Sequence, residues 1–496
     1  MWMTEQQYLD MAAACDRLLR APGTSLARLA IPALHFLNEH PSCLAQYAPA
    51  LVQRSRGRIS TMPRAVVRAA RGLVRALGAP PPAPTPGGPV DVLIVSHLLN
   101  PDQLHQENDF YFGALQRLLA DRGVTSLLVL INHLREPGKA HITRPYAFPR
   151  MIVPRAVTPT AEARIWNHCS KAWRTLRREA ASAFAPFDSR LAMLASWEAL
   201  SAPTVTNLRL HASMATLCRA VDPKVVVTTY EGSVVERMIW HAARTAKRRP
   251  LCVGYQHALV LSRAHAIRRC IGAPGIDCDP EVILTLGEAP HAALAASPGL
   301  QAVRLIEYGS HRRAELPALP PLQDRPRHCL VLPDASHPEC VTLFDFAVAC
   351  ARLGPDIHFV LRPHPMVDVP WLLHRHPALN TLPGNMSWSV GKPVEEEFAR
   401  ARYCLYRGSS AAMYAVRAGI KPYYLTRPGE LPFDCLSGLT DWREGVTSPQ
   451  ELIERIGQAD ARVDTDAAKR AATLCERYTS AVRPAAIDEL LALVAA

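Results

Sequence analysis

The chain has 496 residues, of which 49% are hydrophobic and 20% charged, so it can form packed cores and is not a disordered polymer. Its 56 lysines and arginines exceed its 44 aspartates and glutamates, and the resulting net charge of +12 favours anionic partners such as nucleic acid, lipid or a phosphorylated small molecule. The sequence has neither a run of about 18 apolar residues nor a basic-then-apolar leader, so we expect a soluble, cytosolic protein.

The first segment, residues 1–78, is predicted to be a helical, basic appendage. Within 64–77, apolar residues and arginines recur at helical spacing on opposite faces. These residues are Val66, Val67, Ala70, Leu73, Val74 and Leu77 on the apolar face and Arg64, Arg68, Arg71 and Arg75 on the basic face. Such a helix either lies on an anionic membrane or packs on its own domain with a solvated basic face. The Pro-rich stretch 79–89 is predicted to be a stiff linker.

After the linker, short β-branched runs alternate with helical stretches, a pattern typical of buried parallel strands. The first series is predicted at 90–97, 125–131, 224–230, 250–255, 281–287 and 303–309. The second series is predicted at 328–334, 357–363, 401–408 and 421–426. A long stretch at about 160–220 is predicted to form helices between the second and third strands.

Two successive β/α series predict an α/β fold of two doubly wound, Rossmann-like domains that face each other across a cleft. The predicted domains span 90–310 and 327–445, and helices over 446–496 complete the chain. The thirteen cysteines are scattered and form no C-x-x-C pair. Because zinc sites need close ligand pairs and disulfides need an oxidising compartment, we expect reduced thiols, no structural metal and no cofactor.

The most specific motif is an Arg-Pro-His-Pro turn that follows a predicted strand of the second domain and contains Arg362 and His364. The two prolines keep this loop out of helix and so pre-set where the side chains point. Arginine offers a forked pair of donors, and histidine donates a hydrogen bond or carries a charge near neutral pH, which suits a phosphate. The alternative interpretation is an ordinary Pro-rich strand exit.

A second motif, Gly408-Ser409-Ser410, lies between another predicted strand and a helix. Its small residues let backbone amides approach an anion, and both hydroxyls can donate as well. A serine N-cap explains the same residues without a ligand. We expect the strands before this turn and before the Arg-Pro-His-Pro turn to be adjacent, which would bring both loops to one crevice.

A third cluster follows the first strand of the second series and contains Ser336, His337 and Glu339. It either contacts substrate or forms a capping box between Ser336 and Glu339 at a helix start.

The first domain offers Glu231 and His257, each directly after a predicted strand. We expect both to face the cleft from the opposite wall, with Glu231 as a general base for an attacking hydroxyl. An equal alternative is a structural ion pair between Glu231 and Arg237. Rival proton acceptors follow the first strand at Asp102, His105, Glu107 and Asp109.

These motifs resemble the GT-B glycosyltransferases of bacterial surface-polysaccharide assembly, particularly those that use CMP-activated Kdo or sialic acid. Residues 230–237 and 254–257, Y-E-G-x-x-x-E-R and G-Y-Q-H, are similar to surface carbohydrate biosynthesis proteins. The R-P-H-P and G-S-S-A turns are similar to the HP and Ser motifs of CMP-sugar transferases. The resemblance covers about 220–430, and 90–115 loosely. It implies that His364 binds and polarises the departing CMP and that Ser409 and Ser410 hold its phosphate or ribose.

The expected activity is therefore metal-independent, inverting transfer of a sugar from a nucleotide donor, CMP-Kdo or another CMP-linked sugar, to a hydroxyl of a surface glycan. Glu231 and His364 are the expected catalytic residues. The expected substrate- or nucleotide-binding residues are Arg362, Ser409, Ser410, Ser336, Glu339, His257 and Asp109.

Two alternatives remain open. One is a glycerophosphotransferase that uses CDP-glycerol, and the other is a non-catalytic protein that binds a nucleotide or nucleic acid. RNA binding needs aromatic stacking platforms, and the aromatic content is only 6%, so nucleic acid is not an expected partner. The expected partners are a nucleotide sugar, a glycan or glycolipid acceptor and an anionic membrane, the last at the inner face of the cytoplasmic membrane.

Overall fold

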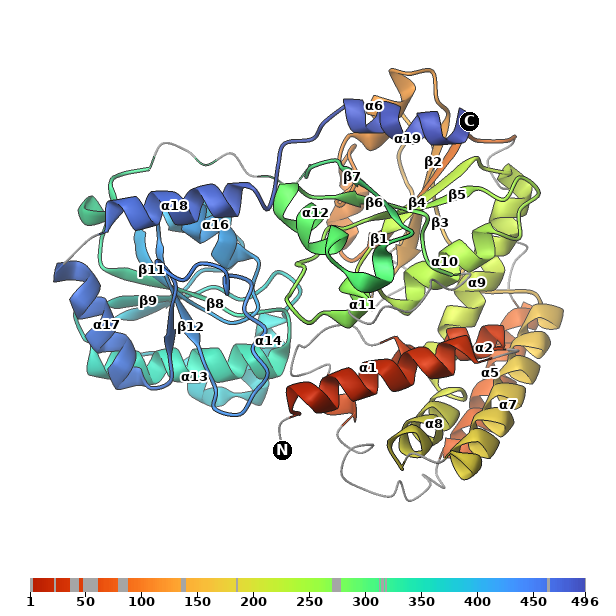
Figure 1. Cartoon of the computed structure of the whole chain (residues 1–496), viewed down its shortest axis with the longest axis horizontal. Helices are drawn as coiled ribbons and strands as arrows, with labels where there is room; N and C mark the ends of the chain where they lie inside the picture. Colours follow the sequence, from red (N-terminus) through yellow and green to blue (C-terminus); the bar gives the residue numbers. More distant parts are fainter. Residues whose placement is uncertain are drawn as a thin grey trace.

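The computed structural model describes residues 3–21, 24–35, 44–47, 61–78, 88–134, 140–183, 186–269, 278–311, 313, 316, 319–461 and 464–495. Most of the predicted linker, residues 79–87, lies outside the described residues. Figure 1 shows two α/β lobes side by side, with a group of helices below the first lobe.

The first lobe is built on a seven-stranded sheet with the order β3-β2-β1-β4-β5-β6-β7, in which every pair is parallel. The strands are β1 (Val92–Leu98), β2 (Ser126–Asn132), β3 (Arg150–Ile152), β4 (Val225–Thr229), β5 (Leu251–Tyr255), β6 (Val282–Thr285) and β7 (Arg304–Glu307). The central strands consist of Val, Leu and Ile with few polar residues because helices cover both faces of the sheet.

The second lobe is built on a six-stranded parallel sheet with the order β10-β9-β8-β11-β12-β13. Its strands are β8 (His328–Leu332), β9 (His358–Leu361), β10 (Met386–Trp388), β11 (Ala401–Tyr406), β12 (Lys421–Leu425) and β13 (Glu444–Val446). The prediction of two doubly wound α/β domains is confirmed. Three strands were not predicted, β3, β10 and β13, because each has three residues, includes polar side chains and lies at a sheet edge.

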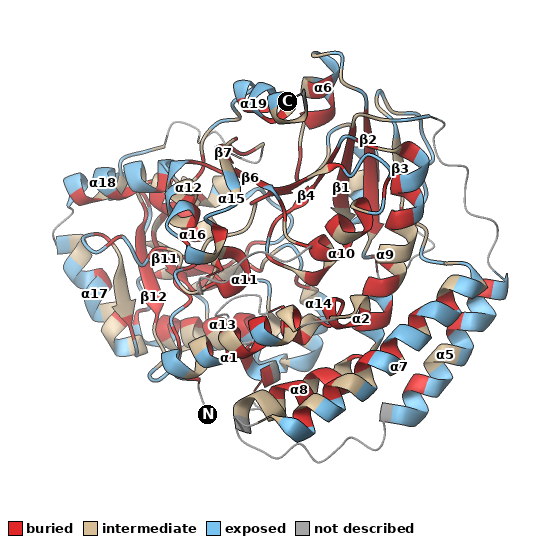
Figure 2. Ribbon diagram, turned by 45° about the vertical axis from the view of Figure 1, so that its right-hand side comes forward, coloured by how far each residue is buried: buried red, intermediate tan, exposed pale blue. Residues whose placement is uncertain are grey.

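The N-terminal helices pack against a group of helices of the first lobe. α1 (Glu5–Arg20) and α2 (Leu26–Leu29) share one apolar core with α7 (Pro159–Ser182), α8 (Pro186–Glu198) and α9 (Ala202–Val221), the three helices predicted at about 160–220. α5 (Thr61–Gly78) lies against α7 at the outer side of this group (Figure 2). Figure 2 also shows that the faces of α1, α7 and α8 that meet inside the group are buried.

The remaining helices cover the two sheets. In the first lobe they are α6 (Leu115–Ala120), α10 (Val234–Ala243), α11 (His265–Arg268) and α12 (Glu288–Ala295). In the second lobe they are α13 (His337–Leu353), α14 (Val369–Arg375), α15 (Val394–Phe398), α16 (Ala411–Arg417), α17 (Pro449–Ala461) and α18 (Thr465–Glu476).

The segment expected to form one set of C-terminal helices, 446–496, is divided between the lobes. α17 and α18 belong to the second lobe, whereas α19 (Ala485–Ala495) returns to the first lobe and lies near α6 (Figure 1). There Ile487 and Leu490 join the apolar core under the first sheet, and Arg122 pairs with Asp488 at 2.6 Å. The chain therefore crosses between the lobes twice, once between β7 and β8 and once between α18 and α19.

Among the described residues, eleven cysteines are free thiols, and ten of these are buried. The same residues contain no group of three His, Cys, Asp or Glu side chains placed to hold a metal ion. None of the described helices is both long and apolar enough to cross a membrane.

Candidate functional site

Each sheet has one point where the strand order reverses, between β1 and β4 in the first lobe and between β8 and β11 in the second. Ligands of open parallel sheets bind beyond the carboxyl ends of the strands at such a point. Glu231 lies two residues beyond β4, and Ser409 and Ser410 lie directly before α16 in the turn beyond β11. The switch points therefore coincide with two of the predicted motifs.

Glu231 and His257, which the sequence predicts to face the same cleft, lie side by side. The Nε2 atom of His257 is 2.8 Å from Oε1 of Glu231, and the Glu231 side chain is 48% exposed whereas that of His257 is 9% exposed. Desolvation opposes ionisation of Glu231, but the charge and hydrogen bond of His257 outweigh it and hold the pKa of this carboxyl below its ordinary value. Glu231 is thus an ionised, accessible carboxylate at neutral pH.

Three aromatic side chains that the sequence analysis did not single out surround this pair. The His97 ring lies between Thr229 and His133, with Nε2 at 2.9 Å from the Thr229 Oγ1 atom and Nδ1 at 2.9 Å from His133 Nε2. Tyr111 packs edge-on against both His97 and His257, at ring centroid distances of 5.7 and 4.6 Å. Burial lowers the pKa of His97 to about 3, so this ring is neutral.

Asp109, an expected substrate contact and rival base, supports the turn that carries Tyr111. It accepts hydrogen bonds from the Ser96 hydroxyl at 2.9 Å and from the backbone N–H groups of Tyr111 and Phe112 at 2.9 and 2.8 Å. Burial raises its pKa. Because these donors already occupy one carboxylate oxygen, Asp109 positions the aromatic ring, and Glu231 is the more accessible base.

The turn that carries Glu231 is fixed by the first turn of α10. The carboxylate of Glu236 accepts the backbone N–H groups of Glu231 at 2.8 Å, Gly232 at 3.0 Å and Ser233 at 3.1 Å. Arg237, the alternative partner expected for Glu231, instead donates to the carbonyl of Gly232 at 2.8 Å. The structural ion pair between Glu231 and Arg237 is therefore absent, and both ends of the turn are held by α10.

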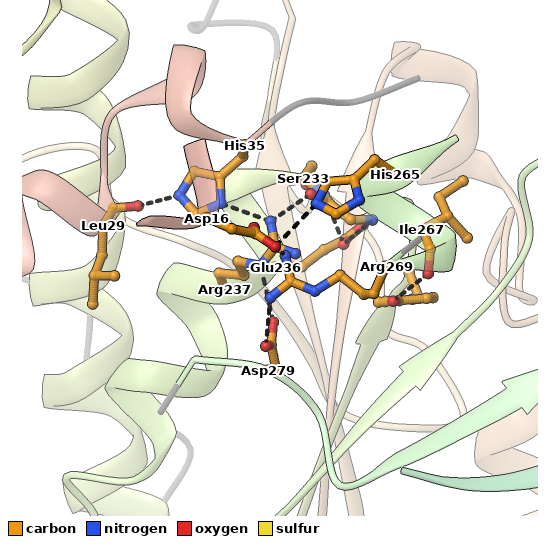
Figure 3. Close-up of polar contacts among 12 residues, drawn as sticks. Asp16, Leu29, His35, Ser233, Glu236, Arg237, His265, Ile267, Arg269 and Asp279 are labelled. Atoms are coloured by element: carbon orange, nitrogen blue, oxygen red, sulfur yellow. Dashed lines mark hydrogen bonds and ion pairs between the residues drawn. The ribbon is translucent and has the colours of Figure 1, made fainter. Parts of the chain in front are cut away.

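Arg237 in turn belongs to a buried polar cluster that reaches the N-terminal helices (Figure 3). It donates to Nδ1 of His35 at 2.6 Å and pairs with Asp279 at 3.1 Å. Asp279 also pairs with Arg269 at 2.8 Å, and Arg269 lies 3.6 Å from Asp16 of α1. Burial and the charge of Arg237 hold the pKa of His35 well below its usual range, so this ring accepts from Arg237 as a neutral imidazole. The N-terminal helices thus brace the Glu231 turn.

In the second lobe, the turn beyond β11 depends on a glycine. Gly408 has a φ of +59°, and a Cβ atom at this position would lie 2.3 Å from the Phe433 ring and 3.5 Å from Cβ of Asp334. Ser409 and Ser410 follow, and Ser410 precedes α16 without a side-chain capping hydrogen bond. The N-cap interpretation of this motif is therefore not realised.

Glu339, expected to contact substrate or to complete a capping box, does not complete the capping box. Its carboxylate pairs with the fully buried Arg407 at 2.7 Å, and Arg407 also pairs with Glu430 at 2.6 Å. Ser336 precedes α13 without a side-chain capping bond, so the capping box is not formed. Through Arg407, Glu339 therefore anchors the start of the turn beyond β11. The Ser336 hydroxyl does not cap α13.

The Arg-Pro-His-Pro turn follows β9. Arg362 donates to Oγ of Ser389 at 3.1 Å and to the carbonyl of Lys392, so its guanidinium is directed toward the loop beyond β10. Nδ1 of His364 accepts the backbone N–H of Met366 at 3.2 Å, which places the proton of the neutral ring on Nε2. His364 thus has one nitrogen fixed by its own turn and an N–H donor on the other.

The strands before the two second-lobe motifs are not adjacent, contrary to expectation. β8 lies between β9 and β11 and pairs with both. The loop beyond β8, which contains Ser336, therefore separates the His364 turn from the Ser409 turn. All three loops still leave the same edge of the sheet, because the strands are parallel.

An apolar contact connects the two halves of the candidate site. Residues 258–260, directly after His257, pack in the same cluster as Phe433 and Cys435 of the second lobe. Phe433 lies against Gly408, and the Cys435 thiol donates to the carbonyl of Ser409 at 3.4 Å. The loop that begins at His257 and the turn that carries Ser409 thus border the same apolar cluster.

Compared with models of known protein families and with curated protein sequences, the chain matches none. Solved structures give distant similarities. The glycotransferase of kitacinnamycin is 16% identical, with 82% of this chain and 99% of that chain covered and a TM-score of 0.45. The glycosyltransferase SnogD from Streptomyces nogalater is 16% identical, with coverages of 82% and 99% and a TM-score of 0.42. The UDP-GlcNAc 2-epimerase from Neisseria meningitidis bound to UDP-GlcNAc is 12% identical, with coverages of 81% and 100% and a TM-score of 0.44. Similarities this distant do not identify the reaction.

Proposed function

We propose that this protein is a glycosyltransferase that moves a sugar from a nucleotide donor to a hydroxyl group of a glycan acceptor. The observation that carries the proposal is the connection of two chemically different loops. One presents the ionised, accessible carboxylate of Glu231 paired with His257. The other presents the exposed Ser410, whose side chain does not cap α16, next to the buried Ser409. Both loops border one apolar cluster that includes Phe433 and Cys435. Transfer of a glycosyl group needs two things within one site. They are a base for the attacking hydroxyl and hydrogen-bond donors that stabilise the charge on the leaving phosphate.

On the acceptor side, Glu231 takes the proton of the attacking hydroxyl as that oxygen forms its bond to the anomeric carbon. The lowered pKa keeps this carboxylate ionised before the reaction, and the neighbouring His257 steadies its position. Because the base approaches from the face opposite the leaving group, the configuration at the anomeric carbon is inverted. The neutral rings of His97 and Tyr111 line the same place and offer stacking surface to a sugar.

On the donor side, the bond between the anomeric carbon and the phosphate oxygen breaks, and its electrons stay on the nucleotide phosphate. The Ser409 and Ser410 hydroxyls and the Nε2–H group of His364 are the donors proposed to stabilise that charge. Ser336, in the loop between them, is a fourth donor of the same kind. The similarity of these turns to HP and Ser motifs favours a CMP-linked donor, CMP-Kdo or a related sugar, and a surface-glycan acceptor.

Donor turnover tests this proposal. The purified full-length chain is incubated separately with CMP-Kdo, CMP-sialic acid and CDP-glycerol, and CMP release is measured by mass spectrometry. We expect release from a CMP-linked sugar, and a strong reduction in the Ser409→Ala/Ser410→Ala double variant. Release from CDP-glycerol alone would instead indicate glycerophosphate transfer, and release from none of the three would contradict the proposed donor class.

A further inference from the structure

Helix α5 packs on the protein through its smallest residues. Ala65, Gly72 and Ala76 are its buried positions, and they recur at helical spacing along one face. At Gly72 the approach is so close that a Cβ atom would lie 2.1 Å from the carboxylate of Glu162 on α7, which itself pairs with Arg209 at 2.6 Å. The small-residue face is therefore the face that docks on α7 and α9.

The large apolar residues of α5 are left in solvent. Of the thirteen large hydrophobic side chains that are exposed in the described part of the chain, six lie on this one helix, with exposures from 39% to 69%. They are Met62, Val66, Val67, Leu73, Val74 and Leu77. Single exposed apolar residues are ordinary, but a continuous stripe of them marks an interaction surface. α5 does pack on its own domain with solvated arginines, as one of the two sequence interpretations expects, but it packs through its small residues and not through this apolar face.

The charge next to the stripe is of one sign. Arg64, Arg71 and Arg75 are exposed on the adjoining face, and the helix contains no acidic residue. The neighbouring α7 also has exposed basic side chains elsewhere on its surface, namely Arg164, Lys171, Arg174 and Arg178. A second copy of the chain docked on this stripe would bring two such basic faces together, which costs free energy. The charge thus favours an acidic partner over self-association.

We propose that α5 binds the surface of an anionic lipid bilayer, lying in its plane. At a rise of about 1.5 Å per residue, its 18 residues form a rod of roughly 27 Å. The apolar stripe would enter the boundary between headgroups and acyl chains while the arginines bind lipid phosphates. The docked face keeps the helix attached to the protein as it binds. This inference goes beyond the proposed glycosyl transfer and does not depend on it.

Vesicle binding by the full-length protein tests the inference. The vesicles consist of phosphatidylcholine alone or of phosphatidylcholine and phosphatidylglycerol in equal parts, and bound protein is measured by co-sedimentation. We expect binding to the anionic vesicles only. The variant Val66→Ser/Val74→Ser/Leu77→Ser should bind them at least about tenfold more weakly, since three inserted side chains are lost. The control Leu353→Ser/Val390→Ser/Leu474→Ser removes three other exposed apolar residues, which lie in the second lobe and are 44% to 53% exposed, and it should bind like the unmodified chain.

Three results would overturn the inference. They are absence of binding to anionic vesicles, binding that the α5 triple variant retains in full, and a dimer in solution that the same variant abolishes. The last result, seen by light scattering, would assign the stripe to a second copy. A circular dichroism spectrum and a melting temperature for each variant distinguish loss of binding from loss of folding.

Discussion

Replacement of Gly408 by alanine should destabilise the second lobe and disturb the proposed nucleotide site together. An alanine at a left-handed φ costs about 1–2 kcal/mol. Its Cβ atom would also lie 2.3 Å from the ring of Phe433, which is fully buried and cannot move without disturbing the contact between the lobes. Overpacking of this kind adds about 1–3 kcal/mol. We therefore expect a loss of about 2–5 kcal/mol in the free energy of unfolding.

Gly419→Ala is the matched control, because Gly419 has a φ of +78° in the same lobe but nothing within 4 Å of its Cβ position. This variant should lose only about 1–2 kcal/mol of unfolding free energy, the cost of an alanine in the left-handed backbone conformation. Urea denaturation of both full-length variants measures the difference, and calorimetric titration with CMP measures binding. Equal destabilisation by the two substitutions would refute the close approach to Phe433. Unchanged CMP affinity in Gly408→Ala would refute a role of this turn in nucleotide binding.

Three further outcomes are expected. Arg407→Leu leaves the buried carboxylate of Glu339 without its ion-pair partner and Glu430 with only Arg427 at 3.9 Å, and it should cost about 3–5 kcal/mol in urea denaturation, whereas a cost below about 1 kcal/mol would contradict this pairing. Glu231→Gln should lower donor turnover about 10²–10⁴-fold while CMP affinity stays unchanged, and full turnover would assign the base elsewhere. Since the folded-state pKa of Glu231 is lowered, turnover should persist as the pH falls from neutral and decline only below 4.5, so a decline near pH 6 would exclude this carboxylate as the group that limits activity at low pH.

The sequence predicts the fold well where each element buries a continuous apolar run. The segment 224–230 contains the strand β4 (Val225–Thr229), whose five residues are all buried. Its run of β-branched residues predicts a central parallel strand. The edge strands β3, β10 and β13 carry no such signal, because three residues half exposed at an edge need no particular composition. The order of the strands is likewise not encoded locally, which is why β8 between β9 and β11 was not expected.

The candidate site was predictable only in part, for a related reason. Glu231 and His257 follow β4 and β5, which are neighbours, so their approach follows from the strand assignments. The pairing of Glu339 with Arg407 joins residues from two different strand exits, and no spacing in the sequence reveals it. His97 was missed although it lies at the end of the first strand, because a lone histidine in an apolar run is ordinary.

The most direct test of the account is a crystal structure of the full-length protein soaked with CMP. We predict that the phosphate lies within hydrogen-bond distance of the Ser409 or Ser410 hydroxyl and of the His364 imidazole. We also predict that Glu231 faces the phosphate across the space where a sugar would bind. A nucleotide bound in another part of the molecule, or one whose phosphate contacts none of these donors, would contradict the glycosyltransferase assignment.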